Sequence, residues 1–132
     1  MHLAEQVATR YFQAVAAGDR STLESLFADD LIYRFPGRSS FAANYQGRDS
    51  VLGYLDRLRE LTDGSLEVEI LDVMTSDTRA TGFVRATASQ GDAKFSWQLV
   101  AVIVSRDGKI TEISLFYDDQ YGVDEFLDRD LR

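Results

Sequence analysis

The segment AKFSWQLVAVIVSRDGKITEISLFYD, residues 93–118, decides the fold. It contains two extended runs, residues 93–105 and 109–118, that are rich in β-branched and aromatic side chains. Polar residues alternate with apolar ones along much of both runs, which is typical of strands with one buried face. Asp107-Gly108 separates the runs, and because Asp and Gly tolerate positive φ, this pair predicts a hairpin turn. The segment therefore predicts two neighbouring antiparallel strands.

Two further extended runs, residues 65–74 and 79–90, precede this hairpin, and Gly91-Asp92 forms a second predicted turn. A shorter alternating run, residues 31–35, lies earlier in the chain and ends at Pro36-Gly37. Proline cannot donate a hydrogen bond to a sheet, so this pair predicts the end of the strand. The sequence thus predicts one early strand and four consecutive later ones.

The remaining periodic segments predict three helices before the long run of strands. Gly18 ends the first helix, and Asp19 and Ser21 are candidate caps of a short second helix, with a capping-box pattern starting at Ser21. The third helix is predicted to open at Gly47-Arg48-Asp49 and to end at Asp63-Gly64. Apolar residues of the first helix recur at spacings of three and four, at Leu3, Val7, Tyr11, Ala14 and Val15.

Helices followed by strands joined by tight turns predict an α+β fold with a mostly antiparallel sheet. Residues 37–46 are predicted to form a polar loop, and residues 119–132 to include a short closing helix. A length of 132 residues fits one ordinary domain, so we expect residues 1–132 to form a single unit.

The order of these landmarks resembles the nuclear transport factor 2-like superfamily, and within it the SnoaL-like and ketosteroid-isomerase-like groups. The resemblance implies a cystatin-like fold, in which a cone-shaped, curved, antiparallel (mixed) sheet wraps around three N-terminal helices and leaves an apolar pocket. This fold hosts isomerases, cyclases, hydrolases, dehydratases and non-catalytic binders, so it does not select one reaction. The matching motifs are Arg10-Tyr11-Phe12, Gly18-Asp19, Leu26-Phe27-Ala28-Asp29-Asp30, Pro36-Gly37, Gly47-Arg48-Asp49, Asp107-Gly108-Lys109-Ile110 and Phe116-Tyr117-Asp118.

The steroid-isomerase pattern is only partly present. Tyr11 matches the position of that family's oxyanion-hole tyrosine, whereas Phe35 stands where the resemblance implies the general-base aspartate. Ala101 stands near the position of the second oxyanion donor. Proton abstraction next to a carbonyl needs a base and an acid held against the same substrate. The sequence therefore argues against ordinary ketosteroid isomerisation.

Strand alternation and the family's register predict which side chains face the pocket. A lining rich in aromatic rings suits a small hydrophobic ligand held by few polar contacts. Aromatic residues at strand spacing also occur as plain core, so both interpretations stay open. The predicted ligand-binding residues are Val15, Tyr33, Phe35, Tyr54, Leu58, Trp97, Leu99, Ala101, Ile113, Leu115 and Tyr117.

The candidate catalytic residues are Asp118, Asp119 and Tyr11. The resemblance implies a carboxylate acid or base near the end of the last strand, which matches Asp118, while strand parity places Asp119 on the same face as Tyr117. Capping of the tail helix is the alternative role for both acids, and a hydrogen bond within the core is the alternative role for Tyr11. Two hypotheses follow: a cofactor-free isomerase, cyclase or hydrolase that uses a pocket aspartate, or a non-catalytic ligand-binding or dimerisation module.

Composition narrows the classes of partner. With 14 Lys and Arg against 22 Asp and Glu, the formal charge is −8, which argues against nucleic acid or an anionic membrane as partner. The absence of cysteine and the single histidine, His2, argue against a metal site and thiolate or histidine catalysis, and no cofactor is expected.

The sequence also predicts a location and an assembly. It has no apolar run long enough to cross a bilayer and no signal-peptide pattern at its start, so we expect a cytoplasmic protein. One face of the run 93–105 is not needed to cover the helices yet is rich in valine, which predicts a homodimer through the outer face of the sheet. The residues concerned are Ser96, Gln98, Val100, Val102 and Val104.

Overall fold

A computed structural model describes residues 3–128, so His2 lies outside the described part of the chain. The helices are α1 (Leu3–Ala17), α2 (Arg20–Leu26), α3 (Arg48–Leu61) and α4 (Gln120–Asp128). The strands are β1 (Phe27–Phe35), β2 (Ala43–Gln46), β3 (Glu67–Thr75), β4 (Arg79–Gln90), β5 (Ala93–Arg106) and β6 (Lys109–Tyr117).

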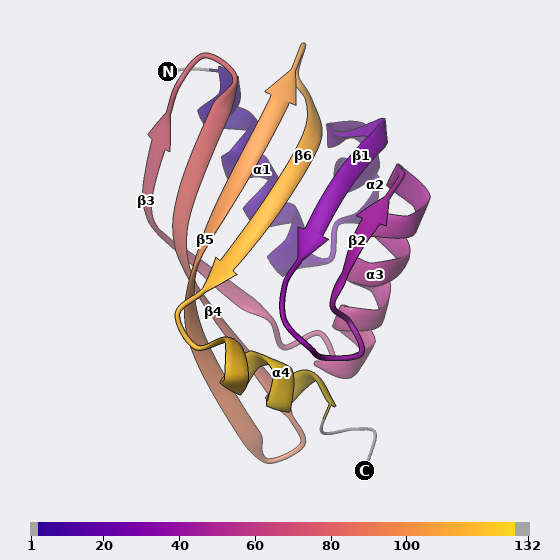
Figure 1. Ribbon diagram of the computed structural model, residues 1–132, viewed down its shortest axis with the longest axis vertical. Coiled ribbons are helices and arrows are strands. Elements are labelled where there is room, and N and C mark those ends of the chain that lie inside the picture. Colours follow the sequence, from indigo (N-terminus) through magenta and orange to yellow (C-terminus); the bar gives the residue numbers. More distant parts are fainter. Residues whose placement is uncertain (1–2, 129–132) are drawn as a thin grey trace.

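The strands form a six-stranded sheet in the order β2-β1-β6-β5-β4-β3. Only the β1–β6 pair is parallel within the described chain, and the other neighbours are antiparallel. Helices α1, α2 and α3 cover one face of the sheet, while α4 lies across the end where β6 stops, beside the long β4–β5 hairpin (Figure 1). The predicted α+β fold, with a curved mixed sheet over three N-terminal helices, is confirmed.

One local prediction was wrong, and the structure decides between the two candidate caps of α2. Residues 43–46 form strand β2 rather than part of a loop, because their backbone pairs with β1 from Ile32 to Phe35. The N-cap of α2 is Asp19 and not Ser21, since the Asp19 carboxylate accepts hydrogen bonds from the backbone N–H and the hydroxyl of Thr22. Ser21 lies inside α2, where its hydroxyl donates to the same carboxylate.

Irregular pairing bends the sheet around the helices. The register shifts between Phe27 and Ile32 in the β1–β6 pair, between Ile70 and Asp72 in the β3–β4 pair, and between Val104 and Ser105 in the β5–β6 pair. Such bulges kink a strand and increase its twist. The bent sheet forms a concave face, and the helices do not fill all of the space above it.

The contact between α1 and β4 fixes how closely the helix approaches this concave face. The ring of Phe12 lies so near Gly82 that a Cβ at position 82 would come within 2.6 Å of the ring. Glycine in a strand interior weakens the strand but permits such an approach. Phe12 on Gly82 therefore sets the separation of the helix layer from the sheet.

Membrane crossing by a helix has no structural support. Among residues 3–128, no helix combines the length and the apolar character needed to span a bilayer.

We expect Gly82→Ala to lower the free energy of unfolding by about 1–3 kcal/mol, because the added methyl overlaps the Phe12 ring in a packed core. The matched control is Gly53→Ala on the exposed side of α3, where an added Cβ meets nothing within 4 Å. That change should stabilise the protein by roughly 0.5–1 kcal/mol, because alanine is the better helix former. Urea denaturation of both variants measures the effect, and equal stabilities would contradict the proposed contact.

Candidate functional site

A cavity lies between the concave face of the sheet and helices α1, α3 and α4. Its volume is about 80 Å³, enough for several waters or a small organic fragment, and it is open to solvent on one side. The surface that lines it is overwhelmingly apolar. This hollow is the candidate ligand site.

Most of the predicted pocket residues line this cavity, and their role in binding remains a prediction. Ala101 and Ile113 do not line it, although both face the helices and are fully buried. They lie further along β5 and β6, towards the connecting turn, where packed side chains leave no hollow. The predicted residues that line the cavity are Tyr11, Val15, Tyr33, Phe35, Tyr54, Leu58, Trp97, Leu99, Leu115 and Tyr117.

Part of the lining was not predicted. Small side chains at alternate positions of β4 face the cavity because they pair with inward residues of β5, such as Val84 with Leu99 and Ala86 with Trp97. Two sequence patterns could have predicted these lining residues: the alternation of residues along β4 and the apolar face of the closing helix. The additional lining residues are Phe12, Leu55, Thr62, Leu66, Val68, Val84, Ala86, Ala88, Val123, Phe126 and Leu127.

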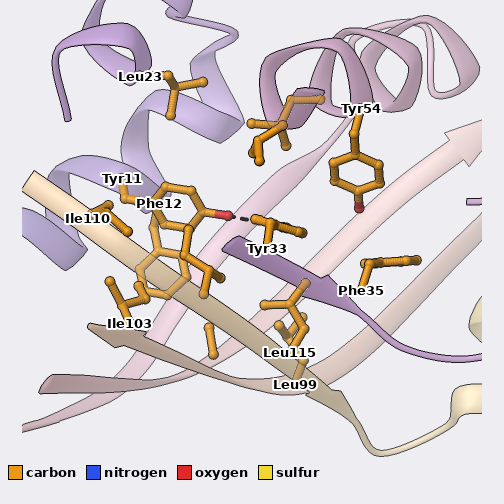
Figure 2. Close-up of a cluster of buried hydrophobic side chains, with 14 of the residues drawn as sticks. Tyr11, Phe12, Leu23, Tyr33, Phe35, Tyr54, Leu99, Ile103, Ile110 and Leu115 are labelled. Carbon is orange, nitrogen blue, oxygen red and sulfur yellow. Dashed lines mark hydrogen bonds between the residues drawn. The ribbon is translucent and has the colours of Figure 1, made fainter. Parts of the chain in front are cut away.

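Four tyrosines bring phenol groups to the cavity. Tyr11 donates a hydrogen bond to the Tyr33 hydroxyl at an oxygen–oxygen distance of 3.4 Å, and Figure 2 shows this pair together with Tyr54. The rings of Tyr33 and Tyr54 are 5.2 Å apart, and the Tyr117 ring lies 5.8 Å from that of Phe35. The phenols therefore gather where α1, α3, β1 and β6 meet.

Burial keeps these phenols neutral. Desolvation raises the pKa of Tyr11 to about 12, and the hydrogen bond with Tyr33 opposes this only in part. Burial, with the unfavourable charges of neighbouring phenolates, raises the pKa of Tyr33 and of Tyr54 well above the ordinary value. Burial also raises the pKa of Tyr117. At neutral pH the cavity therefore offers uncharged hydroxyls that donate and accept hydrogen bonds.

The closing helix α4 covers one end of the cavity. Phe126 packs edge-on against Trp97, with ring centroids 5.0 Å apart and an interplanar angle of 69°. The Gln90 side-chain amide donates to the Phe126 carbonyl at 2.7 Å, which ties the β4–β5 hairpin to α4. On the other side, the carboxylates of Asp124 and Asp128 accept hydrogen bonds from the backbone N–H groups of residues 38 and 40. These contacts hold the apolar face of α4 over the cavity.

Asp118 and Asp119 do not line the cavity, and a catalytic role for either remains a prediction. Asp118 is exposed and continues the outer face of β6, where its carboxylate accepts from the Gln98 backbone N–H at 3.2 Å. Asp119 is exposed and caps α4, accepting from the Gly122 N–H at 2.9 Å. Strand alternation predicted that Asp119 shares the inward face of Tyr117. The alternation does not extend to Asp119, because β6 ends at Tyr117.

The side chains that line the cavity limit the chemistry that can take place there. Within residues 3–128 no carboxylate and no basic side chain lines it, and no group of acidic residues in that range is arranged to hold a metal ion. Neutral phenols stabilise a ligand oxygen but are poor proton acceptors near neutral pH. The cavity therefore combines an apolar lining with a few neutral hydroxyl groups.

The fold and the apolar cavity between helices and sheet together define a protein of the nuclear transport factor 2-like class. The sequence profile of the SnoaL-like domain matches residues 8–113, so the chain belongs to the SnoaL-like domain family. An uncharacterised protein of Mycobacterium tuberculosis (strain H37Rv) is 29% identical over 118 residues, which cover 89% of this chain and 90% of the relative.

Solved structures resemble the chain over almost its whole length. Bal32a, from a soil-derived mobile gene cassette, is 29% identical with a TM-score of 0.87, covering 96% of this chain and 99% of that one. A protein of unknown function with a cystatin-like fold from Xanthomonas campestris is 26% identical with a TM-score of 0.88, covering 96% and 98%. An NTF2-like protein from Burkholderia xenovorans LB400 has a TM-score of 0.75 at 20% identity, covers 92% and 95%, and so shows the fold alone.

We expect the protein to lose stability steeply as pH rises from about 10 to 12. In the unfolded chain a phenol ionises near pH 10, whereas the folded protein holds Tyr11 neutral to about pH 12. The stabilisation is therefore complete below pH 10 and is lost above it, by up to about 1.4 kcal/mol per pH unit for each buried phenol. Denaturation at a series of pH values measures this, and Tyr11→Phe should reduce the slope; a flat profile would contradict burial.

Proposed function

We propose that the protein binds a small hydrophobic molecule and holds it without transforming it. The observation that carries this proposal is the position of Asp118 and Asp119, which are both exposed while neutral phenols and apolar side chains line the cavity. A cofactor-free isomerase, cyclase or hydrolase would need a base within reach of the substrate. The cavity supports binding more directly than it supports proton transfer.

The phenols define what such a ligand carries. Tyr11 and Tyr33 already bond to each other, but a hydroxyl has one donor and two acceptor sites, so each has capacity for a further partner. In a dry, apolar surrounding a hydrogen bond to a ligand oxygen discriminates well against an analogue that lacks the oxygen. We therefore propose a ligand with a carbonyl or hydroxyl oxygen on an apolar ring system.

Matched probes test the phenol contact. Tetralone, a compact aromatic ketone, should bind about three- to tenfold more tightly than tetralin, which lacks the oxygen, because the phenols donate to the carbonyl. Trp97 is the single tryptophan and lines the cavity, so its fluorescence reports binding. Tyr33→Phe and Tyr54→Phe should narrow the difference between the probes, while Asp118→Asn leaves both affinities unchanged. An unchanged preference for tetralone over tetralin in both tyrosine variants would contradict the proposed hydrogen bond from the phenols to the ligand.

The same probe separates binding from catalysis. Tetralone has exchangeable hydrogens next to its carbonyl, so a proton-transfer enzyme would speed their replacement by deuterium in heavy water. We expect exchange no faster than in buffer. Faster exchange would overturn the binding proposal, and its loss in Asp118→Asn or Asp119→Asn would assign the proton transfer to that carboxylate.

We also propose that two copies associate through the outer face of the sheet. Phe83, Val100 and Phe116 lie side by side across β4, β5 and β6, because Val100 pairs with both of the others. Phe116 is 59% exposed, and Met74 on the neighbouring β3 is 60% exposed. An apolar patch of this kind on a sheet is typical of an interface between proteins.

A charge in the patch should separate the copies. Phe116→Asp is expected to give a monomer in sedimentation or light-scattering measurements where the parent chain is a dimer, because a buried unpaired carboxylate opposes association. Tyr121→Asp is the control, since Tyr121 is 87% exposed on α4, outside the sheet face. A monomeric parent chain at high micromolar concentration would refute the dimer.

A further inference from the structure

A second, smaller hollow lies between the C-terminal end of α1, the start of α2 and the C-terminal half of α3. Its volume is about 40 Å³, and exposed residues at its edge open it to solvent. It shares part of its lining with the main cavity. The shared residues are Val15, Leu55, Leu58, Thr62 and Leu66.

Arg59 lies at the rim of this second hollow, beside two glycine turns. Its Nη1 atom lies 1.8 Å from where a Cβ of residue 18 would stand, so only glycine at that position leaves room for the guanidinium. On the other side, Nη2 lies 3.6 Å from the corresponding point of Gly64. Both glycines have positive φ, at 66° and 70°. The guanidinium therefore lies against the backbone at Gly18 and near Gly64, while the Arg59 side chain is exposed to solvent.

The positive charge of Arg59 is uncompensated by any ion pair within residues 3–128. The nearby Arg20 is different, because it bonds to Asp56 and lies 3.4 Å from the Glu24 carboxylate. Arg57, two residues before Arg59, donates to the Tyr45 hydroxyl. Of the arginines around this hollow, Arg59 therefore has its charge available for an anion.

We propose that the ligand is an apolar monocarboxylic acid whose carboxylate binds the Arg59 guanidinium, with its apolar body reaching between Leu58 and Leu66 into the main cavity. A guanidinium matches a carboxylate with two parallel hydrogen bonds, a stronger contact than a neutral pair. Leu58 and Leu66 are only half-buried, so small rotations of their side chains join the two hollows. This inference rests on the proposed binding function and names the chemical class of its ligand.

A comparison of acid and ester tests the inference on the intact protein. Phenylbutanoate and phenylhexanoate are titrated against their methyl esters, which have nearly the same apolar body without the charge, with Trp97 fluorescence and calorimetry as readouts. We expect each acid to bind about five- to tenfold more tightly than its ester at low salt, a gain reduced by solvent screening relative to a buried pair. The preference should shrink as salt is added, while ester affinity stays constant.

Two arginine variants locate the contact. Arg59→Gln should bring the acid down to the affinity of the ester, whereas Arg57→Gln should leave the preference intact. Both variants change the net charge equally, so a loss in both alike would mean a general field effect and would overturn the inference. Equal binding of acid and ester by the parent chain would overturn it too, yet leave the proposed binding function standing. Failure of all four probes to bind would reject the function together with the inference.

Discussion

The rest of the structure depends on strict alternation along β5, the strand that β4 and β6 flank. Trp97 and Leu99 face the helices, while Gln98 and Val100, the residue after each of them, face outwards. The orientation of β5 also sets that of the neighbouring strands, because inward residues of β5 pair with inward residues of β4 and β6. A slip of one residue would turn every side chain to the opposite face. One register therefore fixes both the cavity lining and the apolar outer patch.

The cavity persists because the sheet bends away from helices that are held at a set distance. Phe12 against Gly82 fixes that distance near one end, and the hydrogen bonds of Asp124 and Gln90 hold α4 across the other. Between these supports, aromatic rings pack against one another, some tilted and some edge to face, with centroids about 5–6 Å apart. Within residues 3–128, no buried side-chain nitrogen or oxygen lacks a hydrogen-bond partner.

Much of this arrangement was predictable from the sequence, because alternation and turn residues are local signals. The strands from residue 65 onwards and the cavity positions of Trp97 and Tyr117 followed from period two and from Asp107-Gly108. Strand β2 was missed because residues 43–46 have no apolar alternation and are ordered by pairing with β1. The position of Asp119 was not predicted for a different reason. Tertiary contacts set the point where a chain leaves a sheet, and strand alternation in the sequence does not report that point.

The distribution of charge explains how one site can accept an anionic ligand although its interior is neutral. A carboxylate moved into the phenol-lined cavity would lose its hydration without meeting a cation, a cost of several kcal/mol in a protein interior. At the solvent-facing rim the same group keeps part of its hydration, and Arg59 lies there against Gly18. The net charge of −8 does not prevent this, because exposed charges beyond about 10 Å are largely screened at physiological salt. Charge recognition at the rim and apolar burial within are therefore separable contributions to binding, carried by different residues.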